Sequence, residues 1–315
     1  MATEQQSNIA ILGAGTIGRG FAVAFAAAGH SMRLYDPDAA QVDAAREQAL
    51  ASLASLAHHG LLDGAPEVIA ARITPATTLA HAVADAALVQ ECGPERAEVK
   101  AAILGEADAH APPHAVLASA SSALPASAYA ADLAGRARCL VAHPGNPPFL
   151  LRVIELVPAP FTDTETVARA AAIFTAAGLH PVHVAREIEG FVFNRLQGAM
   201  LREAYALVRD GIASVEDIDR IVRDGLGLRW SAVGPFETVD LNTQGGIAEH
   251  ARRLGPAYAR MGAERGQHDP WTEQLVADVV RQRRALLPLE DWSARGAWRD
   301  AAIMRTLAAR KAASD

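Results

Sequence analysis

A glycine-rich hexapeptide near the N-terminus constrains the fold of this chain more than any other feature. The segment Gly13-Ala14-Gly15-Thr16-Ile17-Gly18 directly follows the apolar run Asn8–Leu12 and opens an Ala-rich stretch with helical periodicity. The first glycine permits a tight turn, the second lets the backbone approach a pyrophosphate, and the third lets the helix pack on the strand. Free N–H groups at the start of the helix would face the phosphates. The sequence therefore predicts a dinucleotide-binding strand, turn and helix, with cofactor contacts at Gly13, Gly15, Thr16, Ile17 and Gly18.

An acidic residue after the next apolar run indicates which dinucleotide is bound. The run Ser31–Tyr35 is followed by Asp36, eighteen residues after Gly18. A carboxylate at this place accepts hydrogen bonds from both hydroxyls of the adenosine ribose and repels a 2′-phosphate. No arginine is adjacent to Asp36 to compensate that repulsion. The pattern therefore predicts NAD rather than NADP.

The chain up to residue 188 alternates short apolar runs with helical stretches. Beyond the first two strands, further strands are predicted over Leu88–Glu91, Val116–Ser119, Cys139–His143, Val153–Val157 and His180–Val184. Helical periodicity marks Ile17–Ala28, Ala39–His58, Glu95–Ala109 and Thr164–Ala177. Strands that alternate with helices of this length pair in parallel, which predicts an α/β fold with a Rossmann-type, doubly wound, mostly parallel sheet.

The chain after Glu189 has a helical pattern throughout, and no strand is predicted there. Gly190–Asp210 has apolar residues mostly at spacings of three, four and seven, which indicates one long helix. Ser214 and Asp217 have the spacing of a capping pair at the start of the next helix. Helical character extends to Lys311, with breaks predicted near Gly225–Gly227, Gly234–Pro235, Gly255–Pro256 and His268–Pro270. Because 315 residues suit two domains, we expect a nucleotide-binding domain over residues 1–188 and an all-α domain over residues 189–315.

Composition argues against several classes of protein. The net charge is −7 and the chain has no basic run, so a nucleic-acid partner is not expected. Cys92 and Cys139 do not form a Cys-x-x-Cys pair, and the histidines form no cluster of ligands, so no metal site is predicted. Residues 1–8 lack the layout of a signal peptide, and no apolar run approaches the ~18 residues of a membrane span. We therefore expect a cytoplasmic protein without a membrane partner.

A histidine and a glutamate at strand positions are candidates for proton transfer. His143 ends one predicted strand, where a histidine that titrates near neutral pH can move a proton, although a lone histidine is more often an ordinary polar residue. Glu155 lies inside the apolar run Val153–Val157, where a carboxylate is costly unless it has a partner. A histidine across the crevice would be a suitable partner, since Glu155 would fix the tautomer of His143 and raise its basicity.

A serine-rich segment, Ala118–Ser122, follows another predicted strand. Residues just past the carboxyl end of a parallel strand face the ligand crevice, so these hydroxyls suit contact with a cofactor or a substrate oxygen. Taken alone, the segment suits a turn that caps the next helix equally well.

Five segments together resemble the 3-hydroxyacyl-CoA dehydrogenase superfamily, and within it the lambda-crystallin type, whose enzymatic form is L-gulonate 3-dehydrogenase. The resemblance covers nearly the whole chain, and its segments are jointly specific although each alone is not. They are Gln90–Glu95, His143–Pro148, Val153–Pro158, Gly190–Gln197 and Gly225–Trp230.

The resemblance implies a role for each matching residue. His143 matches the catalytic histidine and Glu155 the glutamate that orients it. Ser122 and Asn194 match the residues that hold the substrate oxygen, and Asn146 matches a further active-site amide. Glu95 and Lys100 match positions that contact the nicotinamide half of NAD. The all-α domain resembles the superfamily's dimerisation domain, which implies a homodimer with the active site in the cleft between domains.

The substrate implied by the resemblance is a free acid or a coenzyme A thioester. Acyl-CoA enzymes of the superfamily present lysines on the helix pair after the second strand, whereas Ala39–Arg72 has no lysine here. We therefore expect NAD-dependent oxidation of a free 3-hydroxy acid to the 3-keto acid, as in L-gulonate 3-dehydrogenase. Arg229 is a candidate clamp for the carboxylate, with a surface or interface ion pair as its alternative role. Gly145 replaces a bulkier residue and is expected to widen the pocket, and Ala120 stands where acyl-CoA enzymes usually have asparagine.

Three other functions remain open at this stage. One is a short-chain 3-hydroxyacyl-CoA dehydrogenase, which the lysine-free helix pair disfavours. Another is an L-carnitine dehydrogenase, for which recognition of the quaternary ammonium group would require an aromatic cage. The last is a crystallin-like structural protein that retains the fold without activity.

Overall fold

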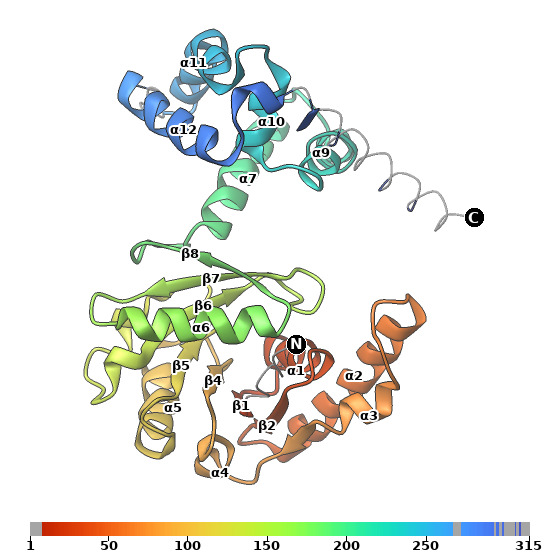
Figure 1. The fold of residues 1–315 in the computed structure, drawn as a ribbon, viewed down its shortest axis with the longest axis vertical. Helices are drawn as coiled ribbons and strands as arrows, with labels where there is room; N and C mark the ends of the chain where they lie inside the picture. Colours follow the sequence, from red (N-terminus) through yellow and green to blue (C-terminus); the bar gives the residue numbers. More distant parts are fainter. Residues whose placement is uncertain are drawn as a thin grey trace. The chain divides into compact units, whose positions relative to one another are not determined.

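The computed structural model describes residues 8–266, 272–292, 294–295, 298, 306 and 309. The chain divides into two compact units, Met1–Met200 and Leu201–Asp315 (Figure 1). Every described helix is too short or too polar to cross a lipid bilayer.

An eight-stranded sheet forms the centre of the first unit (Figure 1). The strands lie in the order β3-β2-β1-β4-β5-β6-β7-β8, and all neighbours pair in parallel except β6 and β7. The strands are β1 (Asn8–Leu12), β2 (Ser31–Tyr35), β3 (Ile73–Pro75), β4 (Leu88–Glu91), β5 (Val116–Ser119), β6 (Cys139–Pro144), β7 (Val153–Pro158) and β8 (His180–His183). The helices are α1 (Thr16–Ala27), α2 (Ala39–His58), α3 (Pro66–Ala70), α4 (Leu79–Val83), α5 (Ala97–His110) and α6 (Thr164–Ala176), and α7 (Phe193–Arg209) begins in this unit.

Helices cover both faces of the sheet. Helices α1, α2 and α6 pack on one face, and α4 and α5 pack on the other. Alternate residues of each strand supply the two cores, as Ile9 and Ile11 do for the first and Ala10 and Leu12 for the second. The structure therefore confirms the α/β fold with a Rossmann-type sheet.

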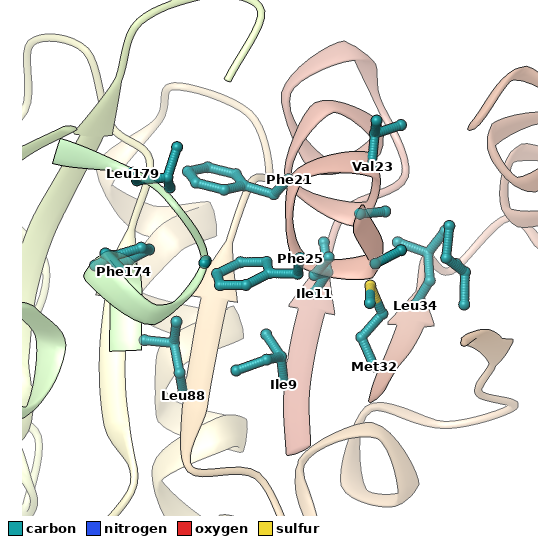
Figure 2. Close-up of a cluster of buried hydrophobic side chains, with 14 of the residues drawn as sticks. Ile9, Ile11, Phe21, Val23, Phe25, Met32, Leu34, Leu88, Phe174 and Leu179 are labelled. Atoms are coloured by element: carbon teal, nitrogen blue, oxygen red, sulfur yellow. The ribbon is translucent and has the colours of Figure 1, made fainter. Parts of the chain in front are cut away.

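Three phenylalanines form the centre of the core on the α1 side. Phe21 and Phe25 are four residues apart on α1, so both point toward the sheet, and their ring centroids lie 5.9 Å apart. Phe174 of α6 lies 6.0 Å from Phe25, and Figure 2 shows these rings beside Ile9 and Leu88. This packing fixes α1, and with it the glycine turn from which α1 starts.

The sequence predicted most of these elements within one or two residues, but it did not predict the short helices α3 and α4, and two further features differ. It missed β3, which has only three residues and so shows no periodicity. The sheet is mostly parallel, as the sequence predicted, but the sequence did not predict that β6 and β7 pair in antiparallel fashion. Only Gly145–Arg152 connects them, and a parallel crossover needs about a dozen residues or more.

The second unit is helical throughout its described residues. After α7 it contains α8 (Val215–Ile221), a π-helical turn (Val222–Leu226), α9 (Gly227–Trp230), α10 (Pro235–Asn242), α11 (Gly246–Glu264), α12 (Glu273–Leu286) and the 3₁₀ turn Leu289–Asp291. Arg265 binds Glu203 and Asp210 and so ties the end of α11 to α7. Ser214 caps α8, since its hydroxyl accepts the amide of Asp217 at 3.1 Å, as the sequence predicted.

The breaks predicted in this unit had mixed outcomes. The break at Gly234–Pro235 is confirmed, because α10 starts at Pro235. The break at Gly225–Gly227 is wrong, since the chain continues through the π-helical turn into α9. The break at Gly255–Pro256 is also wrong, because α11 runs through Pro256. His268–Pro270 lies outside the described residues, as does Lys311. The boundary at residue 188 stays a prediction, since α7 belongs to both units.

Candidate active site

His143 and Glu155 form a buried pair across two neighbouring strands. Strands β6 and β7 place them directly opposite each other in antiparallel register. His143 Nδ1 lies 2.7 Å from Glu155 Oε2, and the residues are 6% and 3% exposed. The sequence predicted the partnership across a crevice, and the structure instead makes the two residues cross-strand neighbours. The antiparallel pairing that the sequence did not show is therefore what brings them together.

The other oxygen of Glu155 holds the start of α7. Glu155 Oε1 accepts the amides of Val192 at 2.7 Å and Phe193 at 3.0 Å. Burial raises the pKa of the Glu155 carboxyl, but the hydrogen bonds from His143 and the two amides outweigh burial and bring the pKa below its ordinary value. Glu155 is therefore a carboxylate at neutral pH. Because a carboxylate only accepts, His143 Nδ1 carries the proton and Nε2 is left as the basic nitrogen.

Two phenylalanines enclose the imidazole of His143. The ring of Phe191 lies 5.6 Å from it and that of Phe193 lies 6.2 Å away, centroid to centroid. Phe191 is fully buried and has a φ of +47°, which is unfavourable for a bulky side chain. The sequence placed Phe191 inside the long helix, but α7 begins only at Phe193. This strained residue turns the chain from Gly190 into α7 and places its ring against the histidine.

The serine-rich turn after β5 is held by Glu95. Glu95 Oε1 accepts the Ser121 hydroxyl at 2.6 Å and the amides of Ser122 at 3.0 Å and Ala123 at 2.9 Å. Burial raises the pKa of Glu95, but these hydrogen bonds, with a smaller contribution from Lys100, bring it below its ordinary value. The turn therefore rests on an ionised carboxylate.

Asn194 joins this turn to α7. Its Nδ2 atom donates to the backbone carbonyl of Ser122 at 3.0 Å. The hydroxyl of Ser122 makes no hydrogen bond within the described part of the chain, and the residue is exposed. The contact therefore orients Ser122 through its backbone and leaves its hydroxyl available.

A buried lysine, Lys100, pairs with Glu91 and also contacts Glu95. Lys100 Nζ lies 3.1 Å from Glu91 Oε2 and 3.3 Å from Glu95 Oε2. Glu91 is fully buried and also accepts the Ser119 hydroxyl and the amide of Gly93. Sequence reasoning missed Glu91, although a carboxylate in an apolar strand is the same signal that identified Glu155. Lys100 is 1% exposed, and its expected contact with the cofactor stays a prediction.

The glycine turn has the geometry that a dinucleotide requires. Gly13 has a φ of +110°, and a Cβ there would lie 2.8 Å from the carbonyl carbon of Cys92. A Cβ on Gly18 would lie 1.9 Å from the carbonyl oxygen of Gly13, whereas Gly15 faces open space. Helix α1 starts at Thr16 without a side-chain cap, so its first N–H groups are available to phosphates.

Asp36 lies against the same turn. Its Oδ2 accepts the amide of Ala14 at 2.9 Å and its Oδ1 accepts that of Asp38 at 3.1 Å. Each oxygen keeps a lone pair for a ribose hydroxyl. Arg33, the nearest arginine along the chain, binds Asp85 instead. These residues therefore fit NAD and offer no partner for a 2′-phosphate.

A cavity of about 330 Å³ in the first unit is lined by the predicted catalytic residues His143, Ser122 and Asn194, whereas Glu155 contacts His143 from outside the lining. Its polar lining consists of Ser122, His143, Asn146, Asn194 and Gln197. Its apolar lining consists of Ile17, Ala120, Pro144, Leu151 and Phe193. The structure thus brings together the four polar residues that were expected to contact the substrate or move its proton, with Ile17 and Ala120 beside them, and it adds Gln197, to which the sequence assigned no role.

Gly145 and Arg229 do not belong to this lining. A Cβ on Gly145 would lie 2.8 Å from the Cβ of Leu151, which lines the cavity, so the wider pocket expected from this glycine stays a prediction. Arg229 lies in α9 of the second unit, where its Nε is buried and has no hydrogen-bond partner among the described residues. The described residues also contain no cluster of three or more side chains placed to hold a metal ion.

A Rossmann sheet, a carboxylate directly after β2 and a buried histidine–glutamate pair are features of the NAD-dependent dehydrogenases. The family model of the 3-hydroxyacyl-CoA dehydrogenase NAD binding domain matches residues 8–188. The model of the 3-hydroxyacyl-CoA dehydrogenase C-terminal domain matches residues 190–285. The chain belongs to the 3-hydroxyacyl-CoA dehydrogenase family.

The names of the relatives within the family state different functions. Lambda-crystallin of Oryctolagus cuniculus is 36% identical over 97% of both chains. L-carnitine dehydrogenase of Streptomyces coelicolor is 36% identical over 89% of this chain and 84% of that protein. The structure of (S)-3-hydroxybutyryl-CoA dehydrogenase from Ralstonia eutropha is similar with a TM-score of 0.66 at 27% identity, over 81% of this chain and 89% of that one. The comparisons therefore establish the family and leave the substrate open.

Proposed function

We propose that this protein oxidises a free 3-hydroxy acid to the 3-keto acid with NAD, as L-gulonate 3-dehydrogenase does. The observation that carries the proposal is that His143, paired with Glu155, lines the same cavity as Ser122 and Asn194. His143 Nε2 removes the proton of the C3 hydroxyl while Glu155 stabilises the imidazolium that forms. The Ser122 hydroxyl and the second N–H of Asn194 hydrogen-bond the oxygen as it becomes a carbonyl. The glycine turn Gly13–Gly18 and Asp36 would hold NAD, which would supply the acceptor for the hydride of C3.

The helix pair after β2 supports a free acid over a coenzyme A thioester. The segment from Ala39 to Arg72 has no lysine, and its two arginines are already engaged with the backbone. Arg46 Nε donates to the carbonyl of Ile73 at 3.1 Å, and Arg72 Nη1 donates to that of Ala26 at 2.6 Å. A polyanionic coenzyme A would gain little charge complementarity there.

The lining of the cavity also bears on whether L-carnitine is the substrate. A quaternary ammonium group is recognised by several aromatic faces. Phe193 is the single aromatic residue among the ten that line the cavity. The lining therefore favours an uncharged polyol chain over carnitine.

A side-by-side assay tests this proposal. NADH formation is measured with L-gulonate and with 3-hydroxybutyryl-CoA, using the native chain and His143→Ala. We expect turnover of L-gulonate, with a loss of roughly 10²–10⁴-fold in the variant. Turnover of the thioester alone would indicate a short-chain 3-hydroxyacyl-CoA dehydrogenase. Absence of turnover across C4–C6 hydroxy acids and the thioester would indicate a structural protein that retains the fold.

We further propose that the protein is a homodimer, with α7 in the interface. Several apolar side chains on this helix are exposed within one chain, among them Leu196 at 63%, Leu201 at 43% and Tyr205 at 75%. Exposed apolar patches of this kind mark association surfaces. Sedimentation velocity measures the assembly, and a monomer at micromolar concentration would contradict the proposal. The cytoplasmic location stays a prediction.

A further inference from the structure

Gln197 lines the cavity beside His143 and has no role in the reaction as proposed. It lies on α7 three residues after Asn194, so the two carboxamides share one face of the helix. Both line the same cavity, together with the carboxamide of Asn146. Three amide side chains therefore surround the place where the substrate would react.

The charge of the lining limits what it can recognise. Among the ten lining residues, His143 is the only titratable one. The other polar members are neutral groups that donate and accept hydrogen bonds, which is the chemistry that matches hydroxyl groups. An unsubstituted acyl chain would make no hydrogen bonds to these amides, whereas a hydroxylated chain would, so the lining distinguishes the two.

Gln197 is the amide best placed to make such a contact. Asn194 already uses one N–H on the carbonyl of Ser122. Gln197 makes no side-chain hydrogen bond within the described part of the chain and is exposed. Both its donor and its acceptor are therefore available to a ligand.

We propose that Gln197 selects polyhydroxylated 3-hydroxy acids by hydrogen-bonding a hydroxyl other than the one that is oxidised. This inference rests on the proposed function, because it assumes that a free hydroxy acid reacts at His143. Gln197 then acts on substrate choice, whereas His143, Glu155 and Ser122 act on the reaction itself.

The test replaces Gln197 with methionine, which keeps the size of the side chain and removes its hydrogen bonds. Gln48→Met, on the exposed surface of α2, is the matched control. The kcat/KM values for L-gulonate and for 3-hydroxybutyrate are measured at saturating NAD. We expect Gln197→Met to lower the value for L-gulonate at least ~10-fold, mainly through KM. The value for 3-hydroxybutyrate and the Kd for NAD are expected to stay within about twofold, as they do in the control.

The outcomes separate the two proposals. If the native chain oxidises L-gulonate and Gln197→Met leaves kcat/KM for it unchanged, the role of Gln197 is overturned and the proposed function stands. An equal fall for both acids also overturns it, because selection requires a difference. If the native chain oxidises only 3-hydroxybutyryl-CoA, the proposed function fails and the inference fails with it.

Discussion

Glu155 Oε2 lies 2.7 Å from His143 Nδ1, and the two residues face each other across the antiparallel strands β7 and β6. The same carboxylate accepts two amides at the start of α7 through its other oxygen. One buried side chain thus fixes the tautomer of the histidine and the position of the helix that carries Asn194. Its removal should affect both the reaction and the stability of the fold.

Replacement of Glu155 with glutamine tests its effect on the reaction. The amide keeps the size of the side chain, but its N–H₂ group facing Nδ1 would favour the histidine tautomer with the proton on Nε2. That tautomer cannot accept a proton from the substrate, so we expect kcat to fall roughly 10²–10⁴-fold. Steady-state kinetics with saturating NAD measure the loss. Glu106→Gln, an exposed site on α5, is the control, and a kcat in Glu155→Gln equal to the control would refute the tautomer argument.

The low pKa of Glu155 makes stability depend on pH. The pKa of this carboxyl is below its ordinary value of 4.5 in the folded chain, so protonation favours the unfolded chain. The stabilisation is complete above about pH 4.5 and is lost as pH falls through the folded pKa. Urea unfolding between about pH 3 and pH 6 measures this loss. In Glu155→Gln the free energy of unfolding should differ less between about pH 3 and pH 6 than it does in the native chain. An equal difference in the two proteins would assign the acid sensitivity to other carboxyls.

Much of the fold could be predicted from the sequence because its strands and helices alternate with clear periods. The bounds of β1, β2 and α2 were predicted to the residue. The direction of β6 and β7 was not predicted because the pattern of an apolar strand gives no direction, although the short connection Gly145–Arg152 is visible in the sequence and leaves no room for a parallel crossover. The break expected at Pro256 was wrong because α11 packs against α10 and α12, and this tertiary packing outweighs the local cost of proline.

Less of the candidate site could be predicted from the sequence. His143 and Glu155 stood out because of their residue types and places in strands. Phe191 did not, since its positive φ depends on the turn between Gly190 and α7. Gln197 did not either, because an exposed glutamine on a helix becomes informative only when the cavity it lines is known.

The ion pair of Lys100 with Glu91 should matter for stability. Both side chains are at most 1% exposed, so Lys100→Met leaves a buried carboxylate without its cation. Breaking such a pair costs about 3–5 kcal/mol. We expect the free energy of unfolding, measured in urea, to fall by this amount in Lys100→Met. It should fall less in the double variant Glu91→Gln/Lys100→Met. A double variant no more stable than Lys100→Met would show that the unpaired charge is not the cause.

Asp36 should determine the choice between NAD and NADP. Asp36→Asn keeps an oxygen for the amide of Ala14 but removes the charge that binds the ribose hydroxyls. A hydrogen bond to a charged group contributes about 1.5–3 kcal/mol, so the Kd for NAD should rise roughly 10- to 100-fold. The preference over NADP should fall as the repulsion of its phosphate is removed. Fluorescence titration measures both constants, and Asp43→Asn on the surface of α2 is the control. An unchanged ratio of the Kd for NADP to the Kd for NAD would exclude Asp36 as the residue that selects the cofactor.

Arg229 should affect the binding of a free carboxylate and leave the cofactor untouched. Its buried Nε has no hydrogen-bond partner among the described residues, and a guanidinium can bind a carboxylate through two parallel hydrogen bonds. Arg229→Met should therefore raise KM for L-gulonate roughly 10-fold or more, because one charged hydrogen bond contributes about 1.5–3 kcal/mol. The Kd for NAD should not change, and Arg253→Met, an exposed site on α11, should leave both constants at their native values. Equal KM values in the two variants would mean that Arg229 has only a structural role.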